Sequence, residues 1–117
     1  RVRHPSGTRL ADARVTKPTA RALFAARLVQ ARELRGLSQR ALGDLMGLGK
    51  EKGSSRINRY ERQVVAIGFD NLQKLADVLD VPVAYLLAET PAMADAILAL
   101  SRMPVHDLTE TAKHLNE

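Results

Sequence analysis

The stretch LSQRALGDLMGLGKEKGSSRINRYE, residues 37–61, has the pattern of two short helices joined by a glycine-rich turn. Ser38 is a good N-cap, because its hydroxyl can accept a hydrogen bond from the free N–H groups of a first turn. Gly47 is typical of the residue that ends a helix. We therefore expect a helix that ends at Gly47, a loop to Gly53, and a second helix that begins at about Ser54. The expected apolar face of the first helix consists of Ala41, Leu42, Leu45 and Met46.

The second helix has a narrow apolar side. Ile57 and Tyr60, three residues apart, are its only large candidates for burial. Its outer side chains are small, amide or basic, with no acid among them: Ser54, Ser55, Arg56, Asn58, Arg59 and Arg62. A helix with this composition is suited to the surface of a polyanion.

This stretch resembles the helix-turn-helix of the lambdoid phage repressor family, also called the Xre or Cro-like family. The resemblance extends over residues 20–89 and rests on Gly36-Leu37-Ser38-Gln39, Ala41, Leu45, Gly47, Ile57, Arg59-Tyr60-Glu61, Leu72, Leu75-Ala76, Leu79, Val81-Pro82 and Leu86-Leu87. Two features depart from the family pattern. About four extra residues lie between the turn glycine and the isoleucine, and residues 62–67 replace a loop that usually contains glycine and basic or proline residues.

The resemblance implies an all-α fold, with a five-helix repressor-like domain over residues 19–89 and a C-terminal helical extension. It also implies an ion pair between Arg32 and Glu61, because neither charge is tolerated alone in a shared core. In proteins of this kind the N-terminal part of the second helix enters the DNA major groove. The residues expected to read base edges are Ser54, Ser55, Asn58 and Arg59. The residues expected to contact phosphates are Ser38, Gln39, Arg56, Arg62, Lys50 and Lys52. Any of these residues, taken alone, is more often ordinary solvated surface.

Two further helices of the domain have recognisable starts. Thr19 is the expected N-cap of a first helix that ends near Arg35. Asp70 is the expected N-cap of a later helix, with Gln73 completing a capping box and Phe69 packing onto the helix from outside.

Segments of different character flank this domain. Residues 1–18 are predicted to form a basic extended arm, which either contacts DNA or is a disordered terminus. Residues 90–117 form the predicted extension, because Thr90 followed by Pro91 is a strong helix start. The extension either covers the core of the domain or forms the contact of a homodimer. A dimer is expected because one recognition helix reads few base pairs.

Charge is distributed unevenly along the chain. Residues 1–62 contain 15 Lys and Arg against 5 Asp and Glu, a net charge of +10. Residues 63–117 contain 3 against 8, a net charge of −5. Positive charge is thus concentrated on the half that contains the helix pair, which favours one face for nucleic acid.

Other classes of function find little support. The chain has no cysteine, which excludes a disulfide framework and a thiolate zinc site and fits a reducing cytoplasm. No apolar run approaches the roughly 18 residues of a membrane span. Its three histidines are far apart, and no nucleophile pattern or carboxylate pair is evident. We therefore expect no enzyme activity, no cofactor and no metal.

The sequence predicts a sequence-specific transcriptional regulator that binds double-stranded DNA, acts as a repressor, and forms a homodimer. The alternative is an antitoxin-like module that binds a toxin protein as well as operator DNA.

Overall fold

The computed structural model describes residues 17–117, apart from the side chains of residues 50 and 51. Every regular element in this part of the chain is helical, which confirms the prediction of an all-α fold. The prediction of an arm over residues 1–18 falls almost wholly outside the described residues. None of the described helices is both long and apolar enough to cross a membrane. The elements are α2 (Ala20–Leu34), α3 (Gln39–Leu45), α4 (Lys50–Glu61), α5 (Phe69–Leu79), the 3₁₀ helix η1 (Val83–Leu87), α6 (Pro91–Ser101) and α7 (Val105–Leu115).

The boundaries of α2 follow from its local sequence. Thr19 Oγ1 accepts a hydrogen bond of 3.1 Å from the Ala22 N–H. At the other end Gly36 has a φ of 67°, a left-handed conformation that glycine adopts without steric cost. The Leu37 N–H donates to the Arg32 carbonyl at 3.0 Å, which satisfies one of the last free carbonyl groups. The helix therefore begins and ends where the sequence places it.

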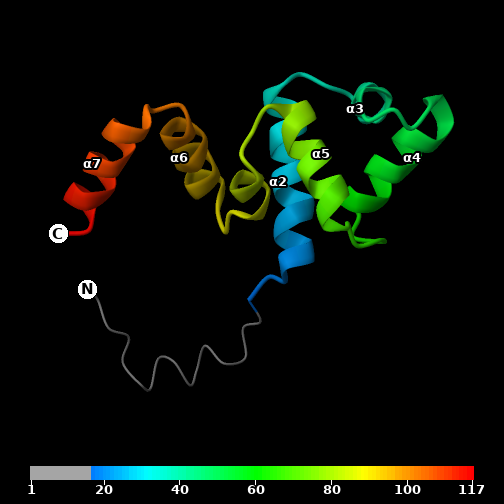
Figure 1. Cartoon of the computed structure of the whole chain (residues 1–117). Helices are drawn as coiled ribbons and strands as arrows, with labels where there is room; N and C mark the ends of the chain where they lie inside the picture. Colours follow the sequence, from blue (N-terminus) through cyan, green and yellow to red (C-terminus); the bar gives the residue numbers. More distant parts are fainter. Residues whose placement is uncertain (1–16) are drawn as a thin grey trace, which may run out of the picture.

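A mainly aliphatic core, with three buried aromatic rings, lies between α2, α5 and η1, and α3 and α4 close it at one end (Figure 1). The side chains buried most completely are Leu28, Leu42, Ile57, Leu75, Leu79, Tyr85 and Leu86. Leu45, which we expected on the apolar face of α3, is instead 55% exposed. The buried side of this short helix is formed by Leu42 and by the C-cap residue Met46. Leu45 lies beside this buried side.

The start of α5 differs from the prediction. Gly68 is the N-cap residue and Phe69 the first residue of the helix, so Asp70 lies inside the first turn. Gly68 provides the extended cap conformation, with φ −84° and ψ 162°. Gln73 Nε2 donates to Asp77 Oδ1 at 2.9 Å, so the predicted capping box is wrong. Phe69 is 86% exposed, so its predicted packing onto the helix is wrong as well.

The C-terminal extension consists of two helices with different surroundings. Thr90 Oγ1 accepts from the Met93 N–H at 3.0 Å, and Pro91 occupies the first position of α6, as the sequence predicts. Ala94 of α6 is fully buried, and Ile97 packs against the core with neighbouring side chains. This first half of the extension therefore covers the domain.

Helix α7 is different, because none of its residues is buried. Val105 and Leu115, at its two ends, are 79% and 71% exposed. Together with Leu108 and Ala112 they form an apolar row at helical spacing. Figure 1 shows α7 at the end of the molecule opposite to α4. The extension thus presents an apolar face that its own domain does not cover.

Candidate nucleic-acid interface

The second helix of the motif is one turn longer than predicted. α4 runs from Lys50 to Glu61, with Gly49 at φ 81° as its N-cap, whereas we expected a loop to Gly53 and a helix start at Ser54. Lysine and glutamate are good helix formers, so the local sequence permits this extra turn. The residues from Lys50 to Gly53, which we expected in a loop, are therefore helical.

A close contact between two glycines holds the extra turn against α3. A Cβ atom added to Gly43 would lie 2.4 Å from the carbonyl carbon of Gly53. A Cβ atom added to Gly53 would lie 2.8 Å from the Cα of Gly43. Neither distance leaves room for a side chain, so α3 and α4 meet backbone to backbone at this point. Both glycines are buried.

The first helix of the motif has the predicted ends. Ser38 Oγ accepts a 2.9 Å hydrogen bond from the Ala41 N–H, which makes Ser38 the N-cap. Gly47 has a φ of 76°, and the Leu48 N–H donates to the Gly43 carbonyl at 3.2 Å. The hydroxyl acceptor of Ser38 is therefore used within the helix, although its O–H remains available as a donor.

The inner side of α4 is the predicted one. Ile57 is fully buried and Tyr60 is 4% exposed. The Tyr60 ring meets the Phe24 ring of α2 edge to face, with centroids 5.9 Å apart. This arrangement is favourable for aromatic pairs and fixes the helix against the core.

The outer side of α4 carries a polar groove of about 390 Å³, lined by Lys52, Ser55, Arg56 and Arg59. These four residues and Arg62 are exposed. Ser54 and Asn58, which were also expected to read bases, are only half-exposed. Since α4 begins four residues earlier than predicted, Ser54 and Ser55 lie in its second turn and not at its start. The side chain of Lys50 lies outside the described part of the structure.

Arg32 and Glu61 form a bidentate ion pair, as the family resemblance implies. Arg32 Nε lies 2.7 Å from Glu61 Oε2, and Nη2 lies 3.1 Å from Oε1. A third guanidinium N–H donates to the Leu37 carbonyl at 3.0 Å. The hydrogen bonds to Glu61 raise the pKa of Arg32, against the opposing effect of burial. The pair joins α2, the start of the motif and the end of α4.

Two expected DNA contacts take part in the same polar network. Gln39 Nε2 donates to Glu61 Oε1 at 2.8 Å. Asn58 Nδ2 lies 3.5 Å from Gln39 Oε1, at the limit of a hydrogen bond. We predicted Gln39 and Asn58 only as DNA ligands and did not predict these internal bonds. Spacing within one helix does not reveal these bonds, because Gln39 belongs to α3 and its partners belong to α4.

The connection after α4 exposes apolar side chains. Gln63 has a φ of 63°, which lies in the left-handed region that favours glycine. Its N–H and that of Val64 donate to carbonyls of α4 at 3.1 Å and 2.9 Å. Val64 itself is 58% exposed.

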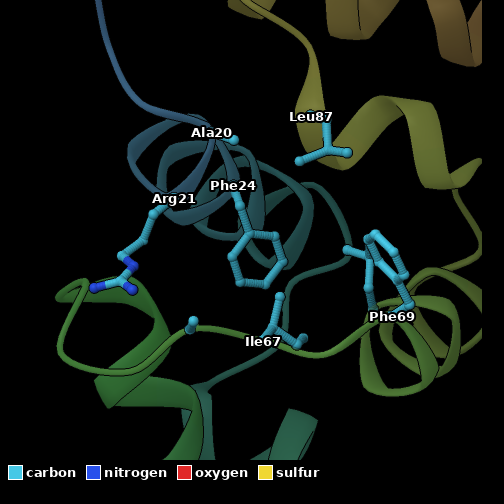
Figure 2. Close-up of a pocket in the computed structure, with 8 residues that line it drawn as sticks. Ala20, Arg21, Phe24, Ile67, Phe69 and Leu87 are labelled. Carbon is cyan, nitrogen blue, oxygen red and sulfur yellow. The ribbon is translucent and has the colours of Figure 1, made fainter.

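A separate apolar pocket of about 210 Å³ lies beside this connection. Figure 2 shows Phe24 and Ile67 on its walls, Phe69 and Leu87 at one side, and the guanidinium of Arg21 at the other. Apart from Arg21, the lining is apolar. The pocket is therefore distinct in position and chemistry from the groove on α4.

Within the described residues, no group of three or more histidine and acidic side chains is arranged to hold a metal ion.

Comparisons with known proteins agree with this geometry. The helix-turn-helix family model matches residues 28–86, from the middle of α2 into η1. Among solved structures, the crystal structure of the transcriptional regulator BswR is similar to this chain, with 34% sequence identity and a TM-score of 0.69. The match covers 79% of this chain and 91% of that one. A comparison with curated protein sequences finds no match. Neither match supports the toxin-binding alternative.

Proposed function

The chain belongs to the Xre or Cro-like helix-turn-helix family and is a DNA-binding transcription regulator, and we propose that it is a homodimeric repressor that recognises a specific operator. Repression follows from occupancy of the operator by the protein. The observation that supports this proposal best is the outer side of α4, where basic and hydroxyl side chains line an open groove.

The role that we propose for each residue follows from its position on α4. Ser55 and Arg59 lie on the exposed side, opposite the buried Ile57 and Tyr60. An arginine there can form two hydrogen bonds to a guanine edge, and a serine can contact any base with weaker discrimination. Ser54 and Asn58 remain in the proposed base-reading set, in positions nearer to α3.

Phosphate contacts are proposed for the residues around this face: Ser38, Gln39, Arg56 and Arg62. They would fix the register of the protein on the duplex without reading sequence. In the free protein the side-chain amide of Gln39 donates a hydrogen bond to Glu61. A phosphate contact by Gln39 would either leave this hydrogen bond in place or replace it. Lys50 belongs to the same proposed set.

The homodimer is proposed to form through the apolar row on α7. A solvent-exposed helix side with Val105 and Leu115 at its ends is stabilised when a second copy covers it. Two identical helices related by a twofold axis present the same row to each other, which gives a closed assembly. A dimer joined at α7 would hold its two α4 helices far apart, because α4 and α7 lie at opposite ends of each chain (Figure 1). We therefore expect half-sites separated by a whole number of DNA turns.

Selection of bound fragments from a pool of randomised double-stranded DNA tests this function. The expected result is enrichment of one sequence with two inverted half-sites, bound less tightly as salt rises, because lysine and arginine side chains displace condensed counterions. Recovery of unselected sequences, or binding that is unaffected by salt, would exclude a sequence-specific operator.

A further inference from the structure

The groove on α4 extends one turn beyond the residues that the sequence assigned to base reading. Lys52 lies in this added turn and lines the groove with Ser55, Arg56 and Arg59. All four lining side chains are neutral or basic. From the sequence we expected Lys52 to lie in the loop before the second helix and to contact phosphates, whereas it lies on α4. Its position on the helix calls for a different role.

Lys52 and Arg59 point in nearly the same direction from α4. They are seven residues apart, and an α-helix drifts by only about 20° from two complete turns over that interval. If Arg59 faces the floor of the major groove, Lys52 faces it too. Arg56, at about 100° per residue, is turned roughly 60° from Arg59 and lies closer to the side of the helix that meets a phosphate backbone.

The helical turn that carries Lys52 is also held in place by a contact with α3. Gly53 follows Lys52 directly, and its backbone is in contact with the backbone of Gly43 in α3. The backbone of Lys52 therefore has a defined position, which a base-reading residue requires.

We propose that Lys52 is a specificity-determining residue that donates to a guanine edge in the major groove. This proposal rests on the proposed function. At 1.5 Å per residue, Lys52 lies about 10 Å along the axis from Arg59 and about 4.5 Å beyond Ser55. The separation of adjacent base pairs is about 3.4 Å. Lys52 therefore extends the recognised half-site outward by about one base pair, to a position that a shorter recognition helix does not reach.

The test is selection from a randomised DNA pool with the wild-type protein, Lys52→Ala and Lys52→Arg, and with Arg59→Ala for reference. Lys74→Ala, which removes an exposed positive charge from α5, is the matched control. We expect Lys52→Ala to lose the guanine preference at one outer position of each half-site and to bind the wild-type site about 5- to 20-fold more weakly. Lys52→Arg should retain that preference, because arginine recognises the same guanine edge. Lys74→Ala should keep every preference.

Two results overturn the assignment while leaving the proposed function intact. One is a Lys52→Ala protein that selects the full wild-type site. The other is a uniform loss of affinity for all sequences with a smaller salt dependence, which identifies Lys52 as a phosphate contact. A wild-type protein that enriches no sequence overturns the proposed function and this assignment together. Because Lys52 is exposed, its substitutions are expected to leave the thermal unfolding midpoint unchanged.

Discussion

At the scale of single residues, Glu61 connects the fold to the interface. Its carboxylate accepts hydrogen bonds from Arg32 and from Gln39. Its side chain is 8% exposed and that of Arg32 is 17% exposed. Charged groups with so little access to water depend on each other, so removal of one leaves the other without compensation.

We expect Glu61→Ala to lower the free energy of unfolding by about 2–4 kcal/mol, slightly less than for a fully buried pair because Arg32 retains some exposure. Urea denaturation measures this loss. Combining Glu61→Ala with Arg32→Ala should cost less than the sum of the two single losses. Strictly additive losses would show that the pair contributes no mutual stabilisation.

At the scale of elements, α3 and α4 meet backbone to backbone at Gly43 and Gly53, within the extra turn of α4. We expect Gly43→Ala to destabilise the protein by about 1–3 kcal/mol, because the new methyl group overlaps the Gly53 backbone and the two helices must separate. A shift in the urea midpoint measures this effect. An unchanged midpoint would mean that α3 and α4 can move apart without loss, and that the extra turn is not fixed by this contact.

Gly68 provides a contrasting glycine, since a Cβ atom there meets nothing within 4 Å. Gly68 is the N-cap of α5 and has the extended conformation of a capping residue. Because glycine has no side chain, it makes no capping hydrogen bond to the first turn of this helix. Gly68→Ser should therefore add a capping bond and raise the unfolding free energy by roughly a few tenths of a kcal/mol. A lower thermal midpoint in this variant would contradict the assigned start of α5.

The same elements show what can be predicted from sequence. The ends of α2 and α3, and the burial of Ile57 and Tyr60, depend on local caps and spacing, so they could be predicted. The start of α4 could not, because Gly53 looks like a loop residue in the sequence. Its absent side chain serves a contact with Gly43, which lies ten residues earlier and becomes a neighbour only after folding.

At the site, the exposure of Ser55, Arg56, Arg59 and Arg62 followed from the positions of Ile57 and Tyr60 in the sequence, whereas Ser54 and Asn58 are only half-exposed. The groove position of Lys52 did not, because it depends on the extra turn. The internal bonds of Gln39 and Asn58 were missed for a related reason. They require α3 to lie beside the end of α4, and hydrogen-bond spacing within one helix does not reveal that arrangement.

At the scale of the whole molecule, we propose that DNA binding and self-association take place at opposite ends. A single Val105→Glu or Leu115→Glu substitution should convert the proposed dimer to a monomer, because a charge on the apolar row opposes its burial. Sedimentation velocity measures the mass, and circular dichroism should show unchanged helix content, since α7 has no buried residue.

Phe69→Ser is the matched control for this experiment. It removes an exposed apolar side chain from the pocket of Figure 2, on a different part of the surface. It should leave the dimer intact. A monomeric Phe69→Ser protein, together with a dimeric Leu115→Glu protein, would place the interface at that pocket and exclude α7.

The affinity of Arg59→Ala for the selected operator and for random DNA, compared with that of the wild type at one fixed salt concentration, tests the role of α4 most directly. Loss of about 1–3 kcal/mol on the operator, with little change on random DNA, is expected if Arg59 reads a base edge. An equal loss on both kinds of DNA would contradict base recognition by Arg59.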